Sequence, residues 1–435
     1  MKCAVRIFFK EIRIVGLENL PKNKPVIIAA NHNNAFMDAI VVAVFIEPQI
    51  YFLTRSDVFN TPLKKWILEK MNLIPIYRMQ EGAGNLHKNE ETFENCYRIL
   101  SENRSILIFS EGICIQEKRL QKLKKGTARI AFGAELFKDF SLDLQVVPLG
   151  INYNKPAQFR SNLLLNFAPA IEVRPYREQL ESDSNKAFMS FTRDLEKAMA
   201  ALIVDLQHKS IDPFYDALME IYGDELREQL NWKVPESNYF KSLRVVGDFL
   251  NDWKMNNDLE FELLKEKTLN YSWKLKELGL KDSTIKRFSK ISAMNFMIRI
   301  FAAVLLFPLH LFSLLFIYWP YCLAYFIAKK TCKHIEFVAS VMLGTGTFLY
   351  LLLFIIGGFV ISTFFTGILY KVLSFGILPL MAFFSLKYYR FLRQVLNDLI
   401  AKMNLQQVEE LVISRAELMK QFNHHILPKI KSRNI

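Results

Sequence analysis

The sequence predicts an α/β fold in which a mostly parallel sheet is flanked by helices, followed by a helical region and C-terminal membrane helices. Three observations predict this arrangement. In the first half of the chain, short runs rich in β-branched residues alternate with stretches whose apolar residues recur every three or four positions. Residues 212–295 are strongly charged and helical in pattern, and long uncharged runs follow them.

The predicted strands and helices follow one another in a repeating order. Strands are expected at residues 26–30, 50–54, 74–77, 106–109, 145–149 and 163–167. Helices are expected between them at residues 36–45, 62–71, 90–102 and 125–137. This alternation implies a parallel sheet covered on both faces, in which active-site groups lie at the carboxyl ends of the strands.

The composition excludes several classes of protein. With 435 residues, 51% of them hydrophobic and 13% aromatic, the chain is not a disordered tether. Its 56 Lys and Arg against 43 Asp and Glu give a net charge of +13, which favours anionic partners. The five cysteines have no C-x-x-C spacing, so neither a zinc ribbon nor a disulfide framework is expected. No nucleic-acid partner is expected, because the cations are not interleaved with aromatic residues in one stripe.

Three uncharged runs, at residues 300–328, 337–370 and 372–386, are membrane candidates, because a spanning helix needs about 20 apolar residues. The second and third runs predict a helical hairpin that breaks near residues 363–367. In the first run, Pro308 and Pro320 favour a bent re-entrant hairpin, and a plain single span is the open alternative. A buried helical core in a large soluble protein is the third interpretation.

These patterns divide the chain into four predicted parts: a first domain at residues 1–210, a helical linker or cap at 211–297, membrane-embedded helices at 298–386 and a C-terminal amphipathic helix at 387–435. Lysine and arginine flank the uncharged runs, and positive charge prefers the cytoplasmic side. No signal peptide is expected, because charges at positions 2, 6, 10 and 11 interrupt any apolar stretch. The sequence therefore predicts an integral membrane protein whose first domain lies on the cytoplasmic side.

A histidine and an aspartate stand at the first predicted strand-to-helix turn. Asn31 and His32 follow the strand, and Asp38 falls in the first turn of the next helix. A neutral imidazole can take a proton from an alcohol if a second group fixes its tautomer, and Asp38 is the candidate for that task. The alternative interpretation is structural, with Asp38 capping its helix and His32 completing a turn.

Further polar residues follow other predicted strands. Arg78 follows the third strand, and Ser110, Glu111 and Gly112 follow the fourth. A guanidinium can bind a phosphate through two hydrogen bonds, and a glycine lets the backbone approach a ligand. The alternatives are a surface cation and an ordinary turn at a strand end.

Two lysines precede another predicted helix. Lys124 and Lys125 come directly before Gly126, where free backbone N–H groups and ammonium groups suit an anion. A solvated charge run is the alternative. No metal site is expected, because the histidines at 87, 208, 310, 334, 424 and 425 are scattered and form no ligand set.

Several short blocks follow one another in the order found in the glycerolipid acyltransferases, which esterify glycerol-3-phosphate and lysophosphatidate. They are residues 32–38, 74–78, 108–112 and 147–151, together with the stretch 123–131. The sequence resembles this superfamily over residues 14–175. Two departures are visible. Five residues separate His32 from Asp38 where the common pattern has four, which is similar to a branch of glycerol-3-phosphate and dihydroxyacetone-phosphate acyltransferases, and Ser110 stands where the family usually has proline.

The resemblance implies that His32 is the general base and Asp38 its partner. It also implies that Arg78, Glu111 and Gly112 form the glycerophosphate site, and we include Asn31, Ser110, Lys124 and Gly126 among the expected substrate contacts. The expected reaction is transfer of a fatty acyl group from an acyl-CoA or acyl-carrier-protein thioester to glycerol-3-phosphate or dihydroxyacetone phosphate, without a cofactor. The alternatives are a 1-acylglycerol-3-phosphate or other lysolipid acceptor, and a non-catalytic protein that binds anionic lipid.

Overall fold

The computed structural model describes residues 1–432 except 48, 78–87, 232–235, 257 and 289. By its internal packing the chain divides into two compact units. The first comprises Met1–Asp205 together with His334–Ser340, and the second comprises Leu206–Lys333 and Val341–Ile435. The division into four parts expected from the sequence stays a prediction.

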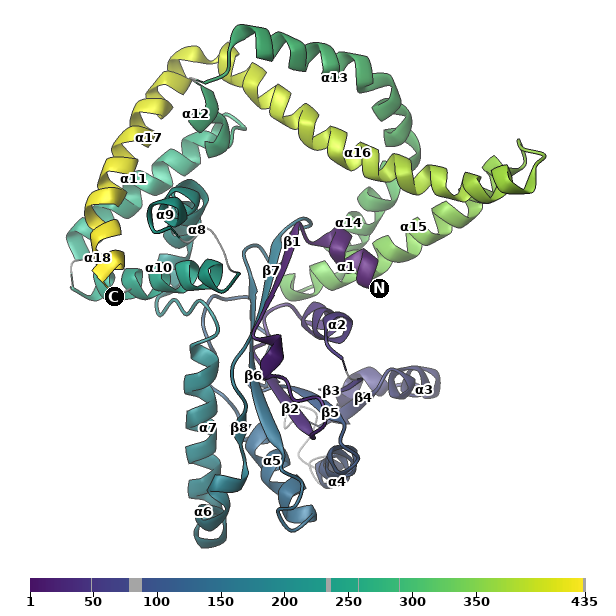
Figure 1. The fold of residues 1–435 in the computed structure, drawn as a ribbon, viewed down its shortest axis with the longest axis vertical. Coiled ribbons are helices and arrows are strands. Elements are labelled where there is room, and N and C mark those ends of the chain that lie inside the picture. Colours follow the sequence, from purple (N-terminus) through teal and green to yellow (C-terminus); the bar gives the residue numbers. More distant parts are fainter. Residues whose placement is uncertain (48, 78–87, 232–235, 257, 289, 433–435) are drawn as a thin grey trace. The chain divides into compact units, whose positions relative to one another are not determined.

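The first unit is built on an eight-stranded sheet (Figure 1). Seven strands lie in the order β1-β7-β6-β2-β5-β3-β4, and β8 pairs with β6 beside this row. The strands are β1 (Glu11–Val15), β2 (Val26–Ala30), β3 (Ile50–Arg55), β4 (Leu73–Ile76), β5 (Ser105–Phe109), β6 (Gln145–Tyr153), β7 (Asn162–Phe167) and β8 (Ile171–Glu172). Pairing is parallel everywhere except between β6 and its neighbours β7 and β8, which confirms the predicted mostly parallel sheet.

The register of the central strands determines where the polar loops meet. β2 lies between β5 and β6, and its last residue, Ala30, is opposite Phe109 on one side and Leu149 on the other. The segments that follow these residues therefore lie at the same edge of the sheet. Strand β1, which the sequence analysis did not predict, pairs in parallel with β7 at one end of the row.

Helices complete the first unit. They are α1 (Lys2–Phe8), α2 (Phe36–Phe45), α3 (Pro62–Lys70), α4 (Lys88–Ser101), α5 (Gly126–Phe137), α6 (Arg177–Ser182) and α7 (Ser184–Ala200), with short 3₁₀ turns η1 (Leu17–Asn19), η2 (Ser56–Phe59) and η5 (Arg174–Tyr176). Ile27 and Ala29 of β2 enter a buried apolar cluster with residues of α4, α5 and α7. All five residues of β2 are buried, as expected of a central strand covered on both faces.

The second unit is helical. Its elements are η6 (Lys209–Ile211), α8 (Asp212–Ile221), α9 (Gly223–Gln229), α10 (Glu236–Asn256), α11 (Asp258–Glu277), α12 (Asp282–Phe288), α13 (Ala293–Ser313), the π-helical turn η7 (Leu314–Tyr318), α14 (Trp319–Thr331), α16 (Ile368–Met403), α17 (Leu405–His425) and α18 (Leu427–Ser432). The turn η8 (Ile335–Phe337) and the start of α15 (Val338–Ser362) lie in the first unit, and the rest of α15 lies in the second.

Among the described residues, three stretches are long and apolar enough to cross a membrane, namely Ala293–Ser313, Ile335–Ser362 and Ile368–Met403. α15 and α16 are separated at residues 363–367, where the hairpin was predicted to break. In the first uncharged run, Pro308 lies inside α13 and Pro320 lies in the first turn of α14, with η7 between them. Whether this run re-enters the same face of a membrane stays a prediction.

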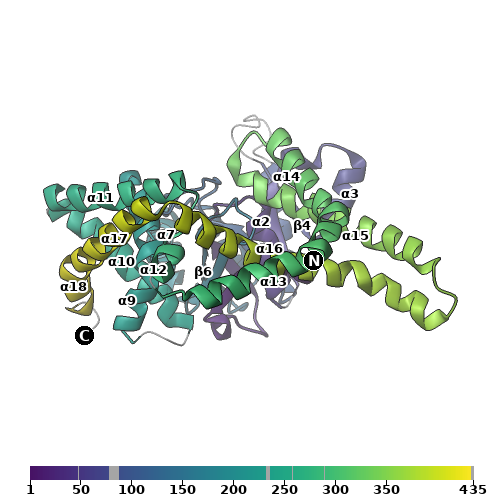
Figure 2. The same cartoon turned by 90° about the horizontal axis from the view of Figure 1, so that it is seen from above.

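Small residues let α15 and α16 lie side by side as an antiparallel hairpin (Figures 1 and 2). A Cβ atom on Gly357 would lie 2.3 Å from Leu378 Cδ1, and one on Gly358 would lie 2.4 Å from Phe375 Cδ1. The Ser374 hydroxyl donates a hydrogen bond to the Gly358 carbonyl at 3.1 Å. Such small-residue contacts are typical of helices that associate within a membrane, where apolar burial alone gives no driving force.

We expect Gly150→Ala to destabilise the first unit. Gly150 lies in β6, where an added Cβ would come within 2.3 Å of the Leu202 carbonyl oxygen. Overpacking of this kind costs about 1–3 kcal/mol, so the thermal unfolding midpoint of the full chain in detergent should fall. Gly126→Ala is the matched control, because the added Cβ would meet nothing within 4 Å apart from its chain neighbours and its own helix. Equal midpoints for the two variants would contradict the close packing at Gly150.

Candidate active site

The structure brings His32 and Asp38 into contact at the carboxyl end of β2. His32 follows this strand, and Asp38 lies in the first turn of α2. The distance from His32 Nδ1 to Asp38 Oδ2 is 2.9 Å. The Asp38 side chain is 0% exposed and that of His32 is 16% exposed, so the imidazole lies between the buried carboxylate and the surface.

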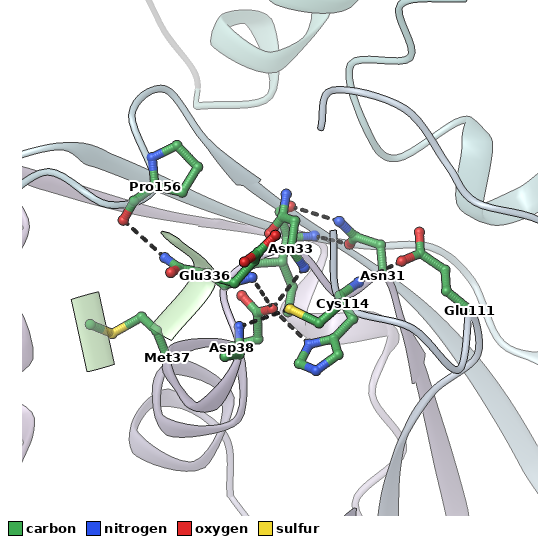
Figure 3. Close-up of polar contacts among 12 residues, drawn as sticks. Asn31, Asn33, Met37, Asp38, Glu111, Cys114, Pro156 and Glu336 are labelled. Carbon is green, nitrogen blue, oxygen red and sulfur yellow. Dashed lines mark hydrogen bonds and ion pairs between the residues drawn. The ribbon is translucent and has the colours of Figure 1, made fainter. Parts of the chain in front are cut away.

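Asp38 accepts hydrogen bonds from three further donors. Figure 3 shows Asp38 together with Asn33 of the same turn. The backbone N–H groups of Asn33 and Asn34 donate to Oδ2 at 3.0 and 2.8 Å, and the Tyr153 hydroxyl donates to Oδ1 at 2.8 Å. Burial raises the pKa of Tyr153 well above its ordinary value, so this hydroxyl keeps its proton. An ionised carboxylate only accepts hydrogen bonds and can satisfy all four donors. Nδ1 of His32 then carries the proton, and Nε2 is left with a free lone pair.

The His32 ring is fixed from a second side by Phe109. The two rings are stacked with centroids 3.9 Å apart and planes 12° from parallel. Phe109 ends β5, and the register of β2 and β5 brings it beside the residue that precedes Asn31. The parallel pairing of these strands therefore supplies both the position and the orientation of the imidazole.

Glu111 joins the site through the same turn. One of its carboxyl oxygens accepts the backbone N–H of His32 at 3.1 Å, and the other accepts that of Gln121 at 3.2 Å. Burial raises the pKa of Glu111 to about 7. The two N–H donors lower this pKa, whereas the negative charge of Asp38 raises it further. Gly112 follows with φ +65°, a left-handed conformation that glycine adopts without strain.

Asn31 and Ser110 make contacts within the protein. The Asn31 side chain bonds both backbone groups of Ile151 in β6, accepting from the N–H at 2.7 Å and donating to the carbonyl at 3.0 Å. The Ser110 hydroxyl lies 2.9 Å from that of Thr127 in α5. Both side chains are buried and support the turns that carry His32 and Glu111. The substrate contacts expected for them stay predictions.

The remaining predicted site residues lie around the start of α5 or outside the described residues. Lys124 is exposed, and its backbone N–H donates to the Ser110 carbonyl at 2.8 Å. Gly126 is the first residue of α5, so free N–H groups lie close to the loop that carries Glu111. Arg78 lies outside the described residues.

Contacts that the sequence analysis missed hold the start of α2. Cys114 Sγ accepts a hydrogen bond from the Ala35 N–H at 3.2 Å. The Met37 N–H donates both to the Ser340 hydroxyl, at 3.0 Å, and to the Asn34 carbonyl. Ala35 itself has φ 42° and ψ −128°, an unfavourable conformation for a residue with a Cβ. These bonds stabilise a strained turn between His32 and Asp38.

The segment His334–Ser340 is therefore part of the candidate site's surroundings. Besides the Ser340 contact, the Phe337 ring packs edge-on against Phe36 with centroids 5.8 Å apart. Glu336 accepts the Gln116 N–H at 3.4 Å. No local pattern predicts these contacts, because about 300 residues separate Met37 from Ser340 along the chain. Within the described part of the chain, no three His, Cys, Asp or Glu side chains are grouped as metal ligands.

Comparison with known proteins relates this site to a family. Residues 11–152, which carry His32, Asp38 and Glu111, match the family model described as Acyltransferase. Over 124 residues the chain is 28% identical to the chloroplastic 1-acyl-sn-glycerol-3-phosphate acyltransferase LPAT1 of Arabidopsis thaliana, covering 28% of this chain and 33% of that protein. Over 210 residues it is 27% identical to Glycerol-3-phosphate O-acyltransferase 2 of Saccharomyces cerevisiae, covering 48% and 27%.

The matched stretches thus span about a third or less of the length of these relatives. Among solved structures, the 1-acyl-sn-glycerophosphate (LPA) acyltransferase PlsC from Thermotoga maritima matches with a TM-score of 0.33 and 15% sequence identity. That match covers 46% of this chain and 75% of that one.

We expect Glu111 to make the stability of the chain depend on pH. The pKa of Glu111 is about 7 in the folded chain and 4.5 ordinarily. Between pH 4.5 and 7, the folded state therefore binds more protons than the unfolded state. Stability should therefore fall as pH rises from about 4.5 to 7, by up to about 3 kcal/mol, and then level off. Glu111→Gln should reduce this slope in thermal unfolding midpoints measured across the range.

The matched control for this measurement is Glu102→Gln, which removes an exposed carboxylate paired with Arg104. This variant should retain the slope of the wild-type protein. A Glu111→Gln slope equal to that of the control would contradict the raised pKa.

Proposed function

We propose that the chain, whose residues 11–152 match the Acyltransferase family model, is a membrane-bound O-acyltransferase acting in phospholipid biosynthesis. The proposed reaction transfers a fatty acyl group from an acyl thioester to glycerol-3-phosphate or dihydroxyacetone phosphate. The single observation that carries the proposal is the His32–Asp38 contact at 2.9 Å beside Glu111. Relatives named as glycerol-3-phosphate and 1-acylglycerol-3-phosphate acyltransferases support it.

In the proposed mechanism, Nε2 of His32 takes the proton from the acceptor hydroxyl as its oxygen attacks the thioester carbonyl carbon. The tetrahedral intermediate then collapses, the C–S bond breaks, and the thiolate leaves with the proton from the imidazolium. Asp38 stabilises the imidazolium between these steps and keeps the ring in the correct tautomer. The acyl donor, an acyl-CoA or an acyl-carrier-protein thioester, is a substrate, and the proposal includes no cofactor.

The acceptor's charged end would be bound by the cationic side of the site. We assign the phosphate to Arg78, Lys124 and the free N–H groups at the start of α5, whose partial positive charge favours an anion. Glu111, within the turn that also fixes His32, would accept a hydrogen bond from a glycerol hydroxyl. This arrangement would present a neighbouring hydroxyl to Nε2.

The proposal includes a location. Three stretches long and apolar enough to span a membrane would anchor the chain, and the domain with His32 would lie on the cytoplasmic side. Both the acyl donor and the acylated product are amphiphiles. A membrane-anchored enzyme can release such a product directly into the bilayer.

A second acceptor is supported by the relative from Arabidopsis thaliana, whose name specifies 1-acyl-sn-glycerol-3-phosphate. The deciding experiment measures thiol release from acyl-CoA and from acyl-carrier-protein thioester by the purified full chain in detergent. The acceptor panel contains glycerol-3-phosphate, dihydroxyacetone phosphate and 1-acylglycerol-3-phosphate. The acceptor that triggers release identifies the reaction. If none of these acceptors triggers thiol release, the result would favour a non-catalytic lipid-binding protein and overturn the proposal.

We expect His32→Ala to lower acyl transfer by about 10²–10⁴-fold, because the general base is lost. Asp38→Asn should also lower the rate strongly, since an amide cannot stabilise the imidazolium as a carboxylate does. His208→Ala is the matched control, because this exposed histidine belongs to the second unit, and its loss should leave the rate unchanged. Turnover in the His32 variant equal to that of the control would exclude His32 as the base.

We expect Tyr153→Phe to lower kcat about tenfold with little change in the acceptor KM, because it removes one hydrogen bond to the Asp38 carboxylate. The matched control is Tyr176→Phe, which removes a comparable tyrosine–carboxylate bond to Asp194 at 2.7 Å in another part of the domain. Steady-state kinetics of both variants check this. An altered KM with unchanged kcat would place the effect of Tyr153 on acceptor binding instead.

A further inference from the structure

Helix α3 has its apolar side chains on the outside of the domain. Leu63, Trp66 and Ile67 are 67%, 60% and 41% exposed, and Met71, directly after the helix, is 60% exposed. Their spacing of three and four residues puts them on one face. No residue of α3 is buried, and only Leu68 is partly covered. A surface helix ordinarily turns such a face toward the core, whereas the described residues of the domain leave this face uncovered.

The helix is nevertheless well specified by its own sequence. Pro62 occupies its first turn, and the Thr61 hydroxyl accepts the Lys64 N–H at 3.3 Å. These are standard start signals, which fix the helix without requiring its apolar face to be buried. The outward face is thus a stable feature of the domain.

Lysines accompany the apolar face. Lys64 is exposed on one flank, and Lys70 lies one turn beyond Trp66 and Ile67 on the same face. Against these and Lys65, α3 carries one acidic residue, Glu69, which pairs with Lys65 at 3.9 Å. Lysines can extend their ammonium groups toward phosphates while their carbon chains lie along apolar surface, and tryptophan favours the same interfacial depth.

An open hollow of about 400 Å³ adjoins this face. Its lining comes from η2, from α3 and from the loop between them, and comprises Asp57, Val58, Asn60, Lys64, Ile67 and Leu68. The apolar surface of Ile67 therefore continues into a recess with further apolar lining from Val58 and Leu68, while Lys64 lies at its polar side. Asp57, the acidic residue of the lining, pairs with Arg55. The apolar part of the lining extends the apolar face of α3.

The position of α3 in the sheet relates it to the candidate site. β3 runs parallel to β5 and β2, with Ile50 opposite Ser105 and Ser105 opposite Val26. The end of β3 at Arg55 therefore lies at the edge where His32 follows β2. α3 begins a few residues later, after η2, so its first turn starts from that same edge.

We propose that the outward face of α3, formed by Leu63, Trp66, Ile67 and Met71 with Lys64 and Lys70, lies in the headgroup region of an anionic lipid bilayer. Helices with an apolar face, a tryptophan and flanking lysines bind membranes in this way. The charge of the helix complements an anionic surface, and the same chain contains candidate membrane spans among its described residues. This contact is independent of the acyl-transfer activity.

The test uses the fluorescence of Trp66 in the full chain, reconstituted into vesicles of phosphatidylcholine and phosphatidylglycerol with or without bromine on the acyl chains. The signal of Trp66 is the difference between the wild-type protein and Trp66→Phe. We expect brominated lipid to reduce this difference signal at least about twofold, as for an interfacial tryptophan. Lys64→Glu combined with Lys70→Glu should weaken the quenching, and so should replacing phosphatidylglycerol by phosphatidylcholine.

Trp273→Phe is the matched control, since Trp273 on α11 is equally exposed at 60%. The bromine-dependent Trp66 signal should persist unchanged when the measurement is repeated in that background. A Trp66 signal quenched by aqueous acrylamide but not by brominated lipid would overturn the proposal. A signal protected from both quenchers would also overturn it, because α3 would then be covered by protein, such as a second copy of the chain. Because the readout is fluorescence, neither result depends on whether the chain transfers acyl groups.

Discussion

The candidate site depends on one buried carboxylate. Asp38 is withdrawn from solvent, where a charge is costly unless its hydrogen-bonding capacity is filled, and four donors fill it. Two of these donors are backbone N–H groups of the turn itself, one is the His32 ring, and one is the Tyr153 hydroxyl from β6. These four hydrogen bonds therefore offset the free-energy cost of burying the Asp38 charge, close the turn and select the His32 tautomer. Changes to this set act on stability and on chemistry together.

The proximity of His32, Asp38 and Glu111 could be predicted from sequence because these residues lie close to strand ends. His32, Asp38 and Glu111 each follow or closely follow a β-branched run, and the parallel register of β2 and β5 brings those ends together. Tyr153, Cys114 and Ser340 could not be predicted in the same way. Each reaches the turn from a distant part of the chain, and a single hydroxyl or thiol contact leaves no periodic pattern. Strand β1 was missed because Glu11 and Arg13 interrupt its apolar residues at the edge of the sheet.

Glu111 shows how burial and hydrogen bonding compete at one group. Its two backbone donors favour the ionised carboxylate, whereas burial and the nearby negative charge of Asp38 oppose it, and the balance leaves its pKa about 7. His32 thus lies between a carboxylate that contacts its ring and a carboxyl group that accepts its backbone N–H. The second group takes no part in the ring's own hydrogen bonds, so the two carboxyl groups hold different parts of His32, one its ring and the other its backbone.

The five-residue spacing between His32 and Asp38 has a structural explanation that does not involve the acceptor. Asn33 and Asn34 use their N–H groups to bind Asp38, so they continue the turn without moving the carboxylate away from the ring. The chain then reverses at Ala35, whose unfavourable φ of 42° is stabilised by Cys114. The longer loop thereby reaches a direct ring–carboxylate contact through local backbone strain. The ring–carboxylate contact is thus made with five residues between His32 and Asp38. The preference of this spacing for an unacylated acceptor such as glycerol-3-phosphate stays a prediction.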